Sequence, residues 1–260
     1  MNRLDGWMVA LLMGASATAG AALPDTLRAC GDVAEFPPFS YYQRANGKKT
    51  REVTGFDLDV LRFVAREHGM QLVVDLLPWP RCLAMATRGG YEVVLDGIKS
   101  PTRERDFLFP PSHYSLTPIF LYLTTRPKPD FSTKERVAKL RICSQADYNY
   151  EPYGVPNALV SNRARTIEDA AQMMKLGRCD VMINVLENLH GYATVGGIDL
   201  LSDKNFAYGF PTWLSKIDFY FMVGRSVPQR AALIAAITHS VDALRKSGEL
   251  ERLRQRHMRP

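Results

Sequence analysis

Residues 54–69 read TGFDLDVLRFVAREHG, and this stretch together with the segments on either side of it decides the fold. Its apolar side chains recur at the three- and four-residue spacing of an amphipathic helix, and Gly69 is suited to end that helix. A short strand is expected before it at 27–30, and an apolar, β-branched strand after it at 70–77. The pattern predicts a β-α-β unit with parallel strands.

The same order of elements returns later in the chain. We expect a helix at 80–88 and a strand at 91–95 in the first unit, then a strand at 140–143, a helix at 166–176 and a strand at 180–185 in the second. Residues 228–257 are expected to form a helix that breaks at Ser247-Gly248. Two α/β units of similar order in one chain predict two lobes.

The composition is that of a soluble globular protein. The chain has 260 residues, enough for two modest domains, and 46% of them are hydrophobic and 23% charged. The net charge is +6, but Lys and Arg are spread along the chain, so we expect no nucleic-acid partner.

The sequence has no C-x-x-C pair and no His at metal-ligand spacing, so it predicts neither a metal site nor a cofactor.

The N-terminus has the pattern of a secretory signal peptide. Arg3 precedes an apolar run at 6–19, and Ala19-Gly20-Ala21 offers a small-x-small cleavage pattern. A membrane anchor is the alternative, but a spanning helix needs roughly 20 apolar residues and this run is shorter. We therefore expect residues 1–21 to be removed near Ala21 and the mature protein to be periplasmic.

Four stretches, taken in order and with their spacing, resemble one known family. They are RACGDVAEFPPFSYY at 28–42, the stretch at 54–69 with its G-F-D-x-D start, YEVVLDGIKSPTRERDFLFPPSHY at 91–114 and VDALRKSGELERLRQRH at 241–257. The chain resembles the family 3 extracellular solute-binding proteins, the polar amino-acid binding components of ATP-driven importers. The segment LPWPRCL at 77–83 is similar to a subgroup of that family with a W-x-R-C motif.

The resemblance implies an α/β fold of the two-lobed periplasmic-binding-protein type (type II), in which each lobe is a mixed sheet flanked by helices. The first lobe is expected at 22–118 with 215–260, and the second at 119–214. A two-strand hinge is expected near 119–123 and 218–223. Ligands of α/β sheets bind at the carboxyl ends of strands, so the cleft between the lobes is the expected site.

The four cysteines, in an exported protein, predict disulfides, and their number alone leaves three pairings open. Cys30 and Cys143 end the first strand of their units, and Cys82 and Cys179 come with a later helix of the same units. With one disulfide in each lobe, the pairs are Cys30–Cys82 and Cys143–Cys179.

Five residues are implied as ligand contacts. Arg105 matches the family arginine that clamps the ligand carboxylate with a planar fork of donors, and Ser100 adds a further donor. Phe36 and Trp79 match side chains that pack on the ligand body. The second lobe is expected to add donors at Asp147 and the residues just before it. The alternatives are a surface arginine paired with a neighbouring acid, and aromatic side chains that only fill the core.

One departure from the family concerns the ligand's amine. Members that bind α-amino acids carry an Asp after the strand that matches 180–184, and here that position is Val185. Asp147, Glu187 and Asp32 are the acids that could replace it. If none does, the ligand is not a simple α-amino acid.

The sequence therefore predicts an exported, monomeric solute-binding protein without catalytic activity. Its ligand is a small polar molecule that carries a carboxylate, an amino acid or a related organic acid, and its partner is the membrane permease of an ABC importer. One alternative is a cleft enzyme of the dehydratase type on the same fold, with Glu187 and His190 as an acid-base pair. The other is a ligand-sensing module for a membrane receptor.

Overall fold

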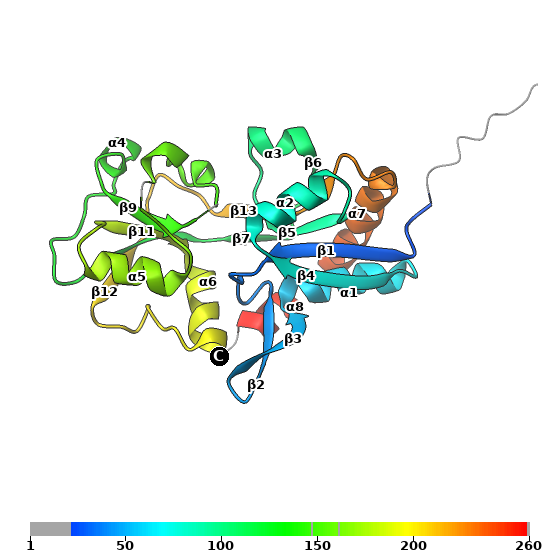
Figure 1. Cartoon of the computed structure of the whole chain (residues 1–260), viewed down its shortest axis with the longest axis horizontal. Coiled ribbons are helices and arrows are strands. Elements are labelled where there is room, and N and C mark those ends of the chain that lie inside the picture. Colours follow the sequence, from blue (N-terminus) through cyan, green and yellow to red (C-terminus); the bar gives the residue numbers. More distant parts are fainter. Residues whose placement is uncertain (1–21, 147, 161, 259–260) are drawn as a thin grey trace, which may run out of the picture.

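Two α/β lobes stand side by side in the computed structural model (Figure 1). The structure describes residues 22–146, 148–160 and 162–258, so the predicted signal peptide at 1–21 lies outside the described residues. Each lobe is built on its own mixed sheet with helices packed against it, and the predicted fold class is thereby confirmed. Within the described ranges, no helix is long and apolar enough to cross a membrane.

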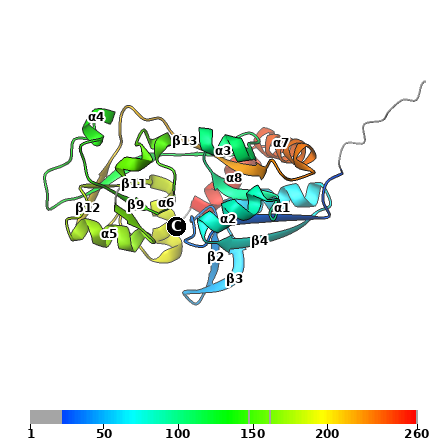
Figure 2. The same cartoon turned by 45° about the horizontal axis from the view of Figure 1, so that its top comes forward.

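The first lobe draws on both ends of the chain. Its sheet has the strand order β4-β1-β5-β13-β6, and β7 also pairs with β13. The strands are β1 (Thr26–Asp32), β4 (Gln71–Leu77), β5 (Val93–Gly97), β6 (Phe107–Leu108), β7 (Tyr114–Leu116) and β13 (Ile217–Gly224). The hairpin of β2 (Tyr41–Ala45) and β3 (Lys48–Thr54) projects from this lobe in both views (Figures 1 and 2).

Helices cover both faces of the first sheet. They are α1 (Phe56–Glu67), α2 (Trp79–Thr87), α3 (Pro101–Asp106), α7 (Arg230–Lys246) and α8 (Glu249–Met258). Leu27 and Ala29 of β1 join the core cluster of α1 and α7, whereas Cys30 joins the cluster of α2. Because successive strand residues point to opposite faces, α2 lies on the face opposite α1 and α7.

The second lobe is formed by the middle of the chain. Its sheet has the order β10-β9-β11-β8-β12, from β8 (Pro118–Leu123), β9 (Ile142–Gln145), β10 (Asn162–Ala164), β11 (Val181–Val185) and β12 (Phe206–Gly209). Its helices are α4 (Lys134–Val137), α5 (Ile167–Lys175) and α6 (Leu186–Gly191), which continues as a π-helix (Tyr192–Gly196). Short 3₁₀ turns lie at Glu151–Tyr153 and Asn157–Leu159.

The chain crosses between the sheets twice. It leaves the first sheet after β7 and enters the second at β8, and β13 returns it to the first sheet after β12. Both views show β13 at the junction of the lobes (Figures 1 and 2). The predicted lobe limits at 118/119 and 214/215 fall close to these crossings and remain a prediction.

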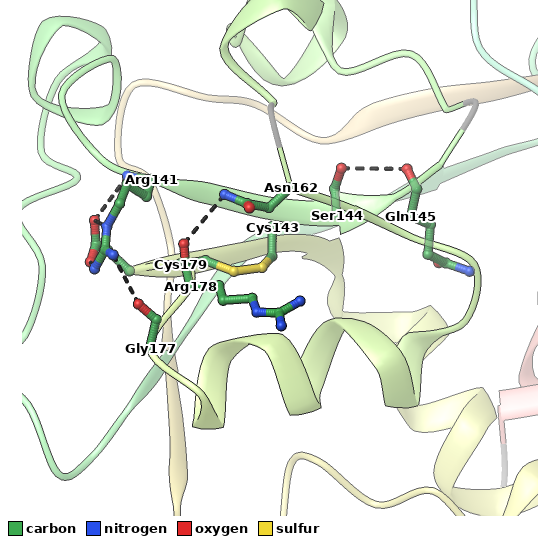
Figure 3. Close-up of a disulfide and its surroundings, with 9 residues drawn as sticks. Arg141, Cys143, Ser144, Gln145, Asn162, Gly177, Arg178 and Cys179 are labelled. Atoms are coloured by element: carbon green, nitrogen blue, oxygen red, sulfur yellow. Dashed lines mark hydrogen bonds and ion pairs between the residues drawn. A yellow bond between two sulfur atoms is a disulfide. The ribbon is translucent and has the colours of Figure 1, made fainter.

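The structure joins the cysteines in the predicted pairs. The Cα atoms of Cys30 and Cys82 lie 5.8 Å apart and those of Cys143 and Cys179 lie 5.6 Å apart, within the usual range for disulfides. The first pair fixes α2 to β1. The second ties β9 to the turn before β11, where Arg141 also donates to the Gly177 carbonyl oxygen at 2.8 Å (Figure 3).

A buried contact joins the lobes to each other. Asn188 of α6 donates from Nδ2 to the Pro37 carbonyl oxygen at 2.8 Å, and the Tyr192 hydroxyl donates to the Glu35 carbonyl oxygen at 3.0 Å. Asn188 is fully buried, so its hydrogen bond is shielded from water. Gly191 faces the same loop, and a Cβ atom there would overlap the backbone of Pro37. We call these three residues of the second lobe, with the loop 35–38, the α6 contact.

The substitution Gly191→Ala tests whether the α6 contact holds the lobes together. The added methyl group meets backbone rather than a flexible side chain, so the two surfaces must separate, and overpacking of this kind typically costs about 1–3 kcal/mol. We expect a larger radius of gyration for this variant than for the wild type in small-angle X-ray scattering.

Gly196→Ala is the matched control, because a Cβ atom there makes only ordinary contacts with side chains. It should leave the radius of gyration unchanged. An unchanged radius in Gly191→Ala as well would show that the α6 contact does not set the distance between the lobes.

Candidate functional site

A pocket that is partly open to solvent lies between the lobes. The first lobe and its crossing strand line it with Asp32, Phe36, Trp79, Asp96, Ile98, Arg103 and Phe219, and the second lobe lines it with Tyr148, Asn149, Tyr150 and Tyr153. The pocket therefore has both charged groups and aromatic walls, and it is complete only when the lobes are close together.

The cation of the pocket is Arg103, on the first turns of α3. Ser100 begins this helix, because its Oγ accepts a hydrogen bond from the Arg103 backbone N–H at 3.3 Å. Arg103 Nη1 donates to the Ile98 carbonyl oxygen at 3.0 Å, and the guanidinium lies 5.3 Å from the centre of the Trp79 ring. Burial lowers the pKa of Arg103 to about 10, so the group remains charged at neutral pH.

Within the described ranges, no carboxylate forms an ion pair with Arg103. A guanidinium has five N–H donors, and only one backbone oxygen accepts from this side chain. The group is therefore able to bind an anion from outside the chain, and its planar fork suits a carboxylate.

The structure does not bring Arg105 to the pocket. Arg105 is exposed on α3, whereas Arg103 is partly buried. Residues two apart on a helix point about 200° apart around its axis, so the two arginines face opposite sides. Arg103, two positions before the predicted Arg105, is the arginine that lines the pocket. Ser100 is buried and caps α3, so it positions the arginine and does not line the pocket.

Six aromatic side chains form the walls of the pocket. Phe36 stacks against Phe219 with a centroid distance of 5.5 Å, and the tyrosines of the second lobe face them. Phe36 and Trp79, both predicted as ligand contacts, are among the lining residues. Trp79 is 6% exposed, and within the described residues its indole N–H has no hydrogen-bond partner. A buried donor without an acceptor is costly, and a ligand acceptor would remove that cost.

Two carboxylates also line the pocket, both at the carboxyl ends of parallel strands. Asp32 ends β1, and Asp96 lies near the end of β5. Asp96 has a left-handed backbone (φ 54°), a conformation that Asp tolerates better than most residues. Burial, with Asp57 nearby, raises the pKa of Asp96 well above its usual value. Asp32 was one of the predicted replacements for the missing family acid, whereas Asp96 was not predicted.

A buried acid-histidine pair lies behind Asp96. Asp57 Oδ1 and His113 Nε2 are 2.8 Å apart, and the Asp96 backbone N–H donates to Asp57 Oδ2 at 3.2 Å. The His113 ring stacks on Phe221 at 4.0 Å, which excludes water. Burial raises the pKa of Asp57 to about 8 and lowers the pKa of His113 to about 3. The pair is therefore held in its uncharged form around neutral pH.

The remaining predicted residues lie elsewhere. Asp147 falls outside the described residues. Glu187 accepts hydrogen bonds from the Thr117 backbone N–H at 2.8 Å and its hydroxyl at 2.9 Å, so it braces the crossing into β8, and His190 is exposed. Neither lines the pocket, and neither does Val185, which is buried at the end of β11. In the part of the chain that the structure describes, no three His, Cys, Asp or Glu side chains gather to hold a metal ion.

Comparison with known proteins gives one family and many related structures. The model of the bacterial extracellular solute-binding proteins, family 3, matches residues 29–260. No curated protein matches the sequence. Among solved structures, an amino acid ABC transporter substrate-binding protein from Streptococcus pneumoniae bound to L-arginine aligns with a TM-score of 0.70 at 17% identity, covering 90% of this chain and 94% of that one.

Two further structures show how widely this fold is used. A histidine kinase sensor domain similar to periplasmic binding proteins aligns with a TM-score of 0.72 at 19% identity, covering 89% of this chain and 95% of that one. An ancestral amino acid-binding protein, a precursor of cyclohexadienyl dehydratase, aligns with a TM-score of 0.67 at 18% identity, covering 90% and 96%. At these identities the likeness shows the fold alone.

The Asp57–His113 pair predicts how stability depends on pH. Folded Asp57 keeps a proton that the unfolded chain releases above its ordinary pKa of 3.8, so the free energy of unfolding falls as the pH rises toward 8. His113 opposes this trend only below its ordinary pKa of 6.5. Between pH 6.5 and 8 we therefore expect stability to fall, by up to about 1.4 kcal/mol per pH unit for one proton. Asp96, whose pKa is also raised, adds to the same trend.

Urea denaturation at several pH values across this window measures the slope. Asp57→Asn should make the slope shallower, because it removes the buried proton site. Asp106→Asn, at an exposed position on α3, should keep the wild-type slope. Equal slopes for all three proteins would contradict the assignment of a buried, protonated Asp57.

Proposed function

Because the chain belongs to the bacterial extracellular solute-binding proteins of family 3, we propose that it captures a small, carboxylate-bearing solute in the pocket between its lobes and delivers it to the permease of an ABC importer. The ligand is an amino acid or a related organic acid. The protein acts as a monomer in the periplasm, after cleavage near Ala21. It binds its ligand and does not convert it.

The observation that carries the proposal is the charged Arg103 without an acidic partner in the described part of the chain. Even a partly buried cation is unfavourable unless it is paired. The protein meets the guanidinium with one backbone oxygen and one aromatic ring, and leaves its other donors toward a pocket that both lobes line. A ligand carboxylate supplies the missing charge, and the unpartnered indole N–H of Trp79 is a second donor for it.

The W-x-R-C motif supports the same site. Trp79 lies at the start of α2 and forms a wall of the pocket, and Cys82 in the next turn is bonded to Cys30 of β1. The disulfide thus fixes the helix that presents the indole ring. We propose that the chain belongs to the subgroup with this motif, and that the motif serves to hold the wall of the pocket in place.

We propose binding in preference to catalysis because the acid-base pair considered for an enzyme is not assembled at the pocket. Glu187 is bonded to Thr117 at the crossing between the lobes, and His190 is exposed. The lining residues instead combine one cation, two acids and six aromatic rings. Such a set is suited to holding a charged small molecule in one orientation.

A thermal-shift screen against amino acids, organic acids and amines tests the proposal. A ligand at 100 times its dissociation constant stabilises the folded protein by about 2.7 kcal/mol, which is readily measured. For a carboxylate that stabilises the wild type, Arg103→Ala should weaken binding about 30-fold or more, because it leaves the ligand's charge desolvated without its partner.

Arg105→Ala is the matched control, two residues away on the same helix and exposed. It should bind the ligand as the wild type does, with titration calorimetry as the measurement. If no carboxylate stabilises the wild type, or if Arg105→Ala weakens binding as much as Arg103→Ala, the proposed site is wrong.

A further inference from the structure

We propose that Asp96 selects ligands with an amine: its carboxylate accepts hydrogen bonds from an ammonium group of the same molecule whose carboxylate Arg103 holds. The inference rests on the proposed function. It adds that the ligand also carries an ammonium group and that Asp96 is the residue that binds this group. The ligand class that follows is a compact molecule with both charges, in which an apolar or aromatic body lies between the aromatic walls.

The first ground is the position of Asp96. Its carboxylate is fixed on both oxygens, because the Ser40 hydroxyl donates to Oδ2 and the Tyr114 hydroxyl donates to Oδ1 at 2.9 Å. Its backbone N–H is bonded to Asp57 behind it. Ser40 and Tyr114 are buried, so they hold the carboxylate in one orientation at the pocket wall.

The second ground is that Asp96 has acceptor capacity left. A carboxylate offers about four lone-pair sites; the two hydroxyls use two of them and a hydrogen bond with the Asp57 side chain involves a third, so one remains for a ligand. Within the described ranges no Lys, Arg or His forms an ion pair with it. A partly buried carboxylate near a second acid is destabilised in its charged form, and a cation in contact with it reverses this.

The third ground is the pocket around the carboxylate. Asp96 shares the lining with Arg103, so the pocket presents groups of opposite charge to one ligand. The faces of Phe36, Trp79 and Phe219 are also favourable surroundings for a cation. Trp79 also lines the pocket, and its indole N–H is a buried donor with no acceptor in the described part of the protein.

This arrangement differs from the one implied by resemblance to the family. There the amine partner is an acid of the second lobe, and here that position is the buried Val185. Asp96 comes from the first lobe, near the end of β5, three residues after the strand begins and seven before Arg103. One continuous segment, from β5 to α3, would then bind both charged groups of the ligand. The second lobe would contact the ligand with its tyrosine side chains.

The rival explanation is that Asp96 is only structural, an acceptor for Ser40 and Tyr114. The two explanations differ in what Asp96→Asn does to ligands that lack an amine. Asn is of the same size and its oxygen accepts from one of the hydroxyls, so the pocket keeps its shape while the negative charge is removed. A structural defect weakens all ligands alike, whereas loss of an amine acceptor weakens only ligands with an amine.

The experiment uses matched sets of three probes: an amino acid, the same molecule without its amine, and the same molecule without its carboxylate. L-phenylalanine, 3-phenylpropanoate and 2-phenylethylamine form one set, and the corresponding compounds of leucine and glutamine form two more. Titration calorimetry measures each probe against the wild type, Asp96→Asn and Asp106→Asn, the last being an exposed control on α3.

We expect at least one amino acid to bind the wild type more tightly than its deaminated counterpart. Asp96→Asn should weaken that amino acid about 30-fold or more and leave the deaminated acid within about threefold. Asp106→Asn should change neither. Equal binding of amino acid and deaminated acid to the wild type, or an equal loss of both in Asp96→Asn, would overturn the inference and leave the proposed function standing. If no probe of any set binds, the proposed function fails and this inference fails with it.

Discussion

The hydrogen bonds of α6 to the loop after β1 hold the two lobes of this protein against each other, and the properties of the pocket depend on them. Asn188 and Tyr192 donate to main-chain oxygens of the other lobe, and Gly191 lets the two backbones approach. Main-chain acceptors are fixed in position, so the contact specifies the distance between the lobes. With the lobes apart, the same pocket residues would face water, and neither Arg103 nor Asp96 would lack a partner.

When the lobes are close together and no ligand is bound, several polar groups of the pocket lack a hydrogen-bond partner or a charge partner in the described part of the chain. Arg103 has no acidic partner and the Trp79 indole N–H has no acceptor among the described residues, and the raised pKa of Asp96 shows that charging this carboxyl without a cation beside it is unfavourable. Each of these is costly in a pocket that is only partly open to solvent. We propose that a ligand which satisfies these groups favours the arrangement with the lobes close together, because only that arrangement completes the pocket.

Much of the fold was predictable from the sequence. The helix of residues 54–69 is observed at Phe56–Glu67, because its apolar spacing matches the face that it buries, and the cysteine pairs follow from the repeated order of elements. Phe36 and Trp79 line the pocket, and their predicted contact with the ligand remains a prediction. The arginine was assigned to position 105 because α3 is a six-residue helix with no buried residue, so no hydrophobic pattern fixes its register. The signal that could have pointed to Arg103 is its position three residues after Ser100, a residue type that commonly begins helices.

Asp96 was missed for a different reason. In the run YEVVLDG it reads as the polar end of a buried strand, and nothing in the local sequence shows that Ser40 and Tyr114 meet it from distant segments. Glu187 was considered for the ligand's amine but is bonded to Thr117 instead. Long-range contacts of this kind are set by topology, which residue spacing does not encode.

The most direct test of the account is a crystal structure of the protein with the amino acid that stabilises it most. We predict a closed molecule with one ligand in the pocket, its carboxylate within hydrogen-bonding distance of the Arg103 guanidinium and its ammonium group within hydrogen-bonding distance of Asp96. A ligand bound outside this pocket, or one whose carboxylate contacts neither Arg103 nor the Trp79 indole, would contradict the account.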